Sequence, residues 1–392
     1  MNRVRSIDFL RIVFAFLIAF HHFTNTGAIK NSLNTFVSSL PHNTFNLPFI
    51  VDFFFVIAGF FLVTTYKKQK TIDFIKYKFS KLFPLMLLYI TLIKLFSILG
   101  LTTYSFKECI FSLLLLDNVG ITLSNSGVAW FISAYFVTIC FYYHLIANFS
   151  KKSVNMIVFF LIYFSYSFLV HKQNGNISGT SATYYNIINV GMLRAIAGIG
   201  IGYYIAIWYQ HIKQIKFVCS NKLIIACSLL EVLSLSYLTY FLLIKNPNLN
   251  SLIYILTFCI LMMSMLINKG VLSKLLNLKI FTKLASYSLA VYMIHEPVLR
   301  ITRPLIFDKY PEFVTNHIGE AILCYFIIVF VSAVIAHHLI EIPGSKLLNK
   351  LLFLQAENSS LNVENPERER ALPSFIREVI NFNFQREQLC HY

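Results

Sequence analysis

The stretch RVRSIDFLRIVFAFLIAFHH, residues 3–22, decides how the rest of the chain is interpreted. Its middle is apolar apart from Arg11, which predicts a membrane-spanning helix over about residues 7–27. A charged side chain inside a bilayer costs at least about 2.5 kcal/mol, so such residues usually face the interior of the helix bundle and have a function there. Asp8, Arg11 and His22 are therefore candidate site residues.

Helix geometry separates the two adjacent histidines. Arg11 and His22 are eleven residues apart, which is three turns to within about 20°, so they share one face of the helix. Their Cα atoms would lie about 16 Å apart along the axis. His21 would point about 80° away from that face, and we therefore favour His22 as the functional histidine.

The composition is that of a membrane protein. The 392 residues are 57% hydrophobic and only 13% charged, with a mean hydropathy of +0.66. This predicts an all-α, polytopic membrane helix bundle. A secretory signal peptide fits the first helix poorly, because its apolar core contains Arg11 and further apolar segments follow. The seven cysteines show no metal-ligand spacing, so we expect neither a disulfide framework nor a zinc site.

About ten transmembrane helices are expected, followed by a polar tail. The predicted spans cover about residues 7–27, 46–65, 83–101, 128–148, 153–170, 187–208, 223–244, 251–268, 284–301 and 319–340. An apolar run at 110–116 is too short to span and suggests a re-entrant or surface helix. We therefore divide the chain into a membrane domain, 1–350, and a polar cytoplasmic tail, 351–392, for which disorder or a short surface helix is expected.

Lys and Arg set the expected orientation. With the N-terminus inside, seventeen of them fall in inner segments before the tail and six in outer segments. This positive-inside bias places both termini in the cytoplasm. The net charge of +16 then follows from topology and from contact with membrane lipid, so no nucleic-acid partner is expected.

Other charges in apolar spans need partners. Asp52 lies near the outer end of the second span, where an ion pair and a substrate contact are equally plausible. Arg194, in the sixth span, needs an anion, and Asp52 is a candidate on depth alone. Lys78 and Lys81 lie at the inner face, where each by itself fits positive-inside topology slightly better than the binding of a phosphate.

The late apolar segments also carry histidines. His295 precedes Pro297, which is expected to break the helix near the outer face, and His295 either lines a substrate cavity on that side or only packs. His337, His338 and Glu341 have spacings that a metal site would tolerate, but snorkelling at the interface is more ordinary. No metal is expected.

Several motifs together resemble the membrane acyltransferase 3 family. They are the first helix from Asp8 to His22, Val51 to Phe60, Lys78 to Pro84, Trp130 to Tyr135, Ser286 to Pro297 and Ile340 to Pro343. The chain departs from the family pattern in having Ala58 where Ser is usual, Lys78 and Lys81 where Arg is common, and no Glu in the Trp130 motif.

The resemblance implies an O-acyltransferase in the bacterial cytoplasmic (inner) membrane. The donor would be acetyl-CoA or another acyl-CoA on the cytoplasmic side. The acceptor would be a hydroxyl of a cell-surface polysaccharide or of its lipid-linked sugar precursor. The resemblance also favours Lys78 and Lys81 as the residues that bind the donor.

The chemistry of such a transfer assigns roles to the first helix. A base must take the hydroxyl proton, and the carbonyl oxyanion must be stabilised. His22 suits the first role, with interhelical packing as the structural alternative. Arg11 suits an oxyanion or a phosphate of coenzyme A, while an ion pair with Asp8 would be its structural alternative. Arg11 can have both roles if the ion pair with Asp8 orients its guanidinium.

A transporter or flippase of a lipid-linked sugar or acyl group, with no bond made, is the alternative from another functional class. Transporters often contain two similar halves with interrupted helices at matching positions. No internal repeat is visible in this sequence, which favours the enzyme.

Overall fold

A computed structural model describes residues 4–24, 47–100, 105–117, 127–175, 177, 183–185, 187–214, 221–243 and 251–361. The chain divides into two units, residues 1–345 and residues 346–392. In the second unit the described part, 346–361, is helical.

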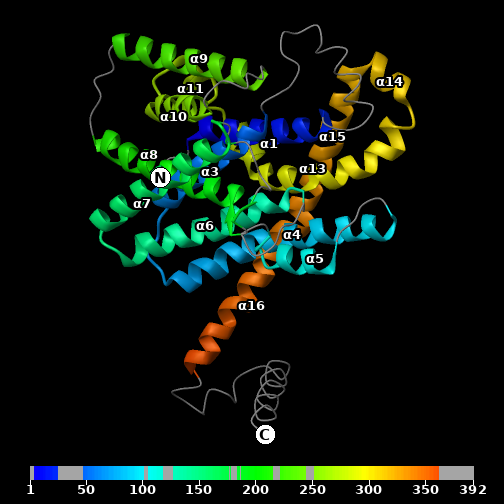
Figure 1. The fold of residues 1–392 in the computed structure, drawn as a ribbon, viewed down its shortest axis with the longest axis horizontal. Helices are drawn as coiled ribbons and strands as arrows, with labels where there is room; N and C mark the ends of the chain where they lie inside the picture. Colours follow the sequence, from blue (N-terminus) through cyan, green and yellow to red (C-terminus); the bar gives the residue numbers. More distant parts are fainter. Residues whose placement is uncertain are drawn as a thin grey trace. The chain divides into compact units, whose positions relative to one another are not determined.

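The described residues are almost entirely helical (Figure 1). The helices are α1 (Arg5–Thr24), η1 (Leu47–Phe49), α3 (Ile50–Thr64), α4 (Thr71–Ile98), α5 (Phe106–Leu113), α6 (Ala129–Asn148), α7 (Lys151–Lys172), α8 (Val190–Gln214), α9 (Asn221–Leu243), α10 (Leu252–Ile267), α11 (Val271–Leu275), α12 (Lys279–Ser286), α13 (Ser288–Thr302), η2 (Arg303–Phe307), α14 (Pro311–Asn316), α15 (Ile318–Ala336), η3 (His337–Glu341) and α16 (Ile342–Leu361). Two short strands, β1 (Thr183–Tyr184) and β2 (Ile188–Asn189), pair antiparallel.

The predicted all-α membrane bundle is confirmed. Among the described residues, eight helices are long and apolar enough to cross a membrane. The other two predicted spans, 251–268 and 284–301, hold α10 and α13, which are shorter helices of 16 and 15 residues. The number of crossings and the orientation therefore stay predictions.

Three element boundaries differ from the predicted ones. Helix α4 begins at Thr71, well before the predicted start at 83, and contains Pro84. The short run at 110–116 falls partly in α5, whose first turn is stabilised by a Ser105–Glu108 capping box. Helix α16 continues to Leu361, into the predicted tail, and residues 362–392 lie outside the described part.

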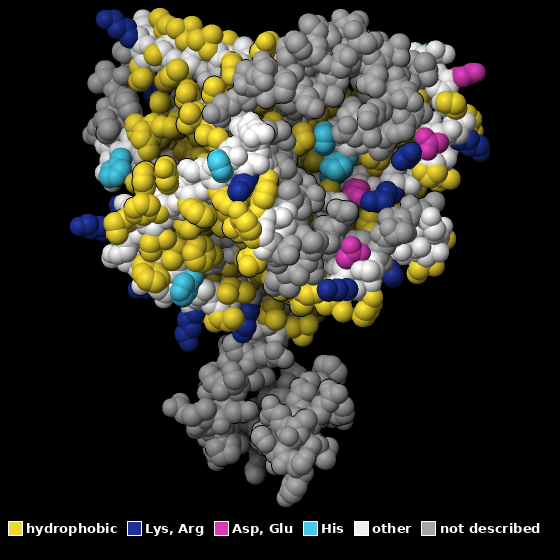
Figure 2. All heavy atoms as spheres, viewed as in Figure 1, with side chains coloured by type: hydrophobic (Ala, Val, Ile, Leu, Met, Phe, Trp, Pro, Cys, Tyr) yellow, Lys and Arg dark blue, Asp and Glu magenta, His cyan; other side chains and the backbone are white. Residues whose placement is uncertain are grey.

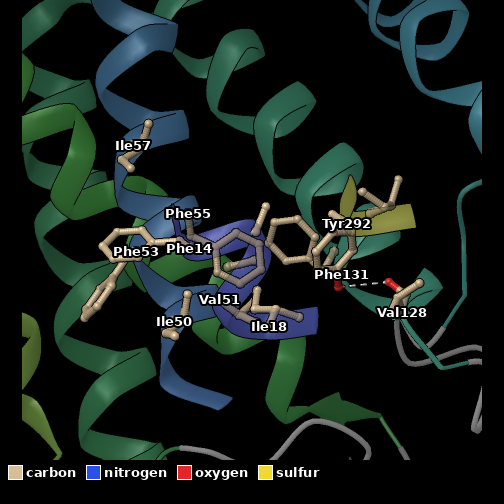
Figure 3. Close-up of a cluster of buried hydrophobic side chains, with 14 of the residues drawn as sticks. Phe14, Ile18, Ile50, Val51, Phe53, Phe55, Ile57, Val128, Phe131 and Tyr292 are labelled. Carbon is tan, nitrogen blue, oxygen red and sulfur yellow. Dashed lines mark hydrogen bonds between the residues drawn. The ribbon is translucent and has the colours of Figure 1, made fainter. Parts of the chain in front are cut away.

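Aromatic side chains form much of the core around α1 (Figure 3). Phe14 of α1 packs on Phe53 of α3, with ring centroids 5.2 Å apart, and Phe53 stacks on Phe258 of α10 at 4.0 Å. Phe131 of α6 packs on Tyr292 of α13 at 4.9 Å. These contacts pack α1 against α3, α3 against α10 and α6 against α13.

Helices α3 and α8 approach each other closely because glycine lies between them. At Gly202 a Cβ atom would collide with the backbone carbonyl of Val56. Backbone at that position cannot give way as the tip of a flexible side chain would, so only glycine fits.

We expect Gly202→Ala to lower the thermal stability of the detergent-solubilised protein, because one helix must move away from the other. Gly319→Ala is the matched control, since a Cβ at this exposed position of α15 would meet open space. Alanine is the better helix former, so the control should be neutral or slightly stabilising. Equal melting temperatures for the two variants would contradict the close approach of α3 and α8.

Candidate active site

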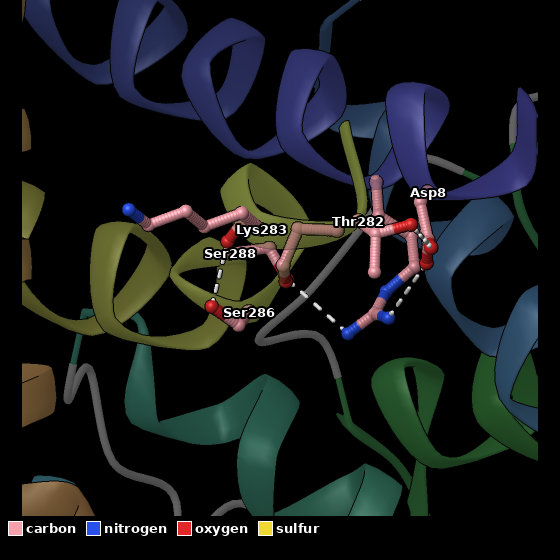
Figure 4. Close-up of polar contacts among 7 residues, drawn as sticks. Asp8, Thr282, Lys283, Ser286 and Ser288 are labelled. Carbon is pink, nitrogen blue, oxygen red and sulfur yellow. Dashed lines mark hydrogen bonds and ion pairs between the residues drawn. The ribbon is translucent and has the colours of Figure 1, made fainter. Parts of the chain in front are cut away.

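Polar residues of α1 meet α12 and α13 in what we call the inner cluster: Asp8, Arg11, Thr282 and Ser288 (Figure 4). Buried Asp8 accepts a hydrogen bond from the Thr282 hydroxyl at 3.2 Å and pairs with Arg11 at 3.5 Å. Arg11 also donates to the Ser288 hydroxyl at 3.3 Å.

The Arg11 side chain stays partly accessible. The expected i,i+3 pair with Asp8 forms, yet the Arg11 side chain stays 29% exposed. Its guanidinium carbon lies 6.0 Å from the centre of the Phe61 ring of α3. Asp8 and Ser288 thus orient the guanidinium of Arg11 from two helices.

Further along α1, His22 approaches α13 in what we call the outer cluster: His22, His295, Glu296 and Arg300. The ring centroids of His22 and His295 are 5.0 Å apart. Ser288 and His295 are seven residues apart, about two helical turns, so both lie on one face of α13. Arg11 and His22 contact that face, and α1 and α13 run in the same direction.

Glu296 is held from three sides. Its carboxylate accepts hydrogen bonds from the Tyr89 hydroxyl of α4 at 2.7 Å and from the backbone N–H of Val128 at 3.1 Å. Arg300 donates to it through Nε at 3.1 Å and Nη2 at 2.5 Å. A Cβ on Gly127, whose φ is +56°, would collide with this carboxylate. The network joins α4, α6 and α13 beside His22.

The roles of Glu296, Arg300 and Tyr89 were not predicted from the sequence. A useful signal was available for the first two, because Glu296 and Arg300 are charged, four residues apart and next to an apolar run. Tyr89 had no such signal. One of twenty-two tyrosines in the chain, it is distinguished only by its contact with Glu296.

The predicted helix break at Pro297 is wrong, because α13 continues from Ser288 to Thr302. Proline removes one backbone donor, but α13 is buried against α1, α4 and α15, and this packing offsets the loss. The Tyr325 hydroxyl of α15 donates to the His295 carbonyl at 3.0 Å. His295 therefore stands on a continuous helix and is fully buried.

Asp52 and Arg194, proposed as partners on depth alone, form an ion pair between α3 and α8. Arg194 donates through Nε to Oδ1 of Asp52 at 3.0 Å and through Nη2 to Oδ2 at 2.9 Å. Arg194 also donates to the Pro48 carbonyl at 2.8 Å, and Tyr254 contacts Asp52 at 3.4 Å. Both charged side chains are 0% exposed, which supports the structural alternative for Asp52.

Lys78 and Lys81 lie near the start of α4. The Lys78 ammonium donates to the Tyr135 hydroxyl of α6 at 3.1 Å and lies 5.3 Å from the centre of the Phe74 ring. Within the described residues, Lys78 forms no ion pair with a carboxylate. Lys81 is exposed and lies 5.9 Å from the Tyr77 ring.

The late histidines lie in the π-helical turn η3. His337 contacts Glu341 at 2.7 Å, and His338 lies 3.3 Å from the Tyr287 hydroxyl. In the described part of the chain, no three His, Cys, Asp or Glu side chains gather as a metal site would require.

The fold and these clusters define a multi-pass membrane protein whose ionisable side chains meet inside its helix bundle. A family model described as an acyltransferase domain matches residues 4–337. The chain therefore belongs to the acyltransferase 3 family of membrane acyltransferases. No curated protein and no solved structure matches the chain.

Proposed function

We propose that this membrane acyltransferase moves an acetyl or other acyl group from cytoplasmic acyl-CoA to a hydroxyl of a cell-surface polysaccharide or its lipid-linked precursor. The observation that carries the proposal is the pair of clusters on α1, which places a partly exposed arginine side chain and an imidazole along one helix face. The protein would lie in a bacterial inner membrane with both termini in the cytoplasm. Donor and acceptor would then reach it from opposite sides.

The donor would bind at the inner ends of α1 and α4. The ammonium of Lys78 has no carboxylate partner in the described residues, and a phosphate of coenzyme A would supply the missing anion. Exposed Lys81 would add a second cation one turn further along α4. The flexible pantetheine arm would carry the thioester deeper into the bundle, past Arg11.

The transfer itself needs a base and an oxyanion partner. The acceptor oxygen attacks the thioester carbonyl carbon, His22 takes the hydroxyl proton, and the carbon–sulfur bond breaks to release the coenzyme A thiolate. The planar fork of Arg11, oriented by Asp8, would stabilise the negative carbonyl oxygen.

Neutralising both lysines should weaken donor binding. We expect the double substitution Lys78→Gln and Lys81→Gln to raise the KM for acetyl-CoA about tenfold or more, since each charge-assisted hydrogen bond contributes about 1.5–3 kcal/mol. Lys151→Gln with Lys152→Gln is the matched control, because these exposed lysines lie at the start of α7, outside both clusters. An unchanged KM in the first double variant would remove Lys78 and Lys81 from the donor site.

The function is tested by transfer of labelled acetyl from acetyl-CoA to an envelope glycan fraction. Membranes that contain the wild-type protein should transfer label, and matched membranes without it should not. A protein that is folded and present at the same level but transfers no label from acetyl-CoA or longer acyl-CoA donors would overturn the proposed reaction.

A further inference from the structure

A polar atom without a partner lies beside His22. His295 is fully buried, and its Nε2 has no hydrogen-bond partner among the described residues. Leaving a buried polar atom unsatisfied costs about 1–3 kcal/mol, so each such atom calls for an explanation, and beside a candidate base a ligand or a transferred proton supplies one.

The other ring nitrogen decides the tautomer of His295. Its Nδ1 lies 3.3 Å from the backbone carbonyl oxygen of Val291. A carbonyl oxygen only accepts, so Nδ1 must carry the proton in this hydrogen bond. The neutral ring then presents a lone pair at Nε2, as a base does when a second group holds its tautomer.

The short distance between the two histidine rings is the second observation. The centroids of His22 and His295 are 5.0 Å apart, and an imidazole nitrogen lies about 1 Å from its ring centre. The rings form no hydrogen bond as they stand, but rotation of a ring brings a nitrogen of His22 within hydrogen-bonding distance of Nε2. At this separation inside a bundle, two positive imidazoles repel strongly, and the pair holds one proton more readily than two.

A fixed carboxylate lies beside this pair of rings. The Glu296 carboxylate is fixed by Tyr89, the Val128 N–H and Arg300 and supplies a permanent negative charge next to both rings. Arg300 partly opposes it, and the ring centroids of His21 and His22 are 5.4 Å apart. The negative carboxylate opposes the cost of a positive ring in this buried place while a proton passes through the pair.

We infer that His22 and His295 form a two-histidine proton relay, in which His295 is the second acid–base group of the transfer. This rests on the proposed function. The acceptor hydroxyl gives its proton to one nitrogen of His22, which releases the proton on its other nitrogen to Nε2 of His295. The positive charge on His295 balances the thiolate formed when the carbon–sulfur bond breaks, and the proton returns to solvent after the products leave.

Two substitutions distinguish a relay from a hydrogen bond that only positions the acceptor. His295→Gln keeps a hydrogen-bonding group near the place of Nε2 but cannot be protonated. His295→Asn keeps a donor near the place of Nδ1 for the Val291 carbonyl and leaves the Nε2 position empty. A relay predicts a fall in kcat of about a hundredfold or more in both variants with little change in the KM for the acceptor. A positioning role predicts that the Gln variant keeps its kcat.

His317→Gln is the control, because His317 is an exposed histidine of the same α13–α15 region. Stability and the elution profile in detergent are compared for all variants. If neither His295 variant folds, the wild-type protein still decides the question through the dependence of kcat on the D₂O fraction of the solvent. Two protons moving together give a curved dependence, and a single proton gives a straight line.

The outcomes separate this inference from the proposed function. A wild-type protein that transfers acetyl, with curved solvent dependence and both variants impaired in kcat, supports the relay. An active His295→Gln variant or a linear dependence overturns the relay and leaves the acyltransferase proposal intact. A wild-type protein without transfer overturns the proposed function.

Discussion

His22→Gln is expected to lower the rate of acyl transfer about a hundredfold to ten-thousandfold, the usual contribution of a general acid–base group. Gln has a similar volume and can donate or accept a hydrogen bond, but it cannot take a proton at neutral pH. Within the outer cluster, the His22 ring contacts the ring of His295 and lies near the fixed carboxylate of Glu296. The measurement is transfer of labelled acetyl in membranes at matched expression.

His21→Gln is the matched control for this experiment. It changes the same residue type at the adjacent position, which points about 100° away around the helix. We expect the His21 variant to keep most of the wild-type activity. If His22→Gln stays active while folded, or if the two variants lose activity equally, His22 is not the base.

Breaking the buried ion pair should have the largest effect on stability. Asp52→Asn leaves the Arg194 charge without its carboxylate at a position with 0% exposure, and Arg194→Met leaves the Asp52 carboxylate alone. We expect each to lower the free energy of unfolding by about 3–5 kcal/mol, the usual cost of an uncompensated buried charge. The measurement is the unfolding of the detergent-solubilised protein, induced by heat or by denaturant.

The double variant Asp52→Asn with Arg194→Met tests the reason for that loss. Removing both charges removes the uncompensated one, so the double variant should be more stable than either single variant. Asp308→Asn is the surface control, since Arg303 and Asp308 are 44% and 41% exposed and such pairs contribute about 0–1 kcal/mol. Additive losses in the double variant would show that the two charges do not act on each other.

The membrane class and the first helix could be predicted from the sequence. Apolar runs near span length and scarce charges predict helices that cross a bilayer, and the eleven-residue spacing put Arg11 and His22 on one face. Both residues do contact one face of α13. These predictions succeeded because they depend on composition and on helix periodicity, which are local properties.

Partners distant in the chain were decided by tertiary structure. Depth alone suggested Asp52 for Arg194, yet only the packing of α3 on α8 brings the two side chains to 2.9 Å. The contact of His22 with His295 joins residues 273 positions apart, and the carboxylate of Glu296 collects donors from α4, the start of α6 and α13. Helix periodicity determines which face a side chain occupies, but not which helix lies opposite.

At Pro297 local chemistry predicted the wrong structure, and tertiary packing decided the right one. Its local chemistry predicts a broken helix, because proline removes a backbone donor and clashes with the preceding turn. In the folded chain α13 continues through it, held by buried contacts with α1, α4 and α15. The sequence by itself determined the helices, their apolar faces and the residues of α1 that need partners. Only the tertiary structure decided which partners these residues meet, because that choice depends on packing energy summed over the whole bundle.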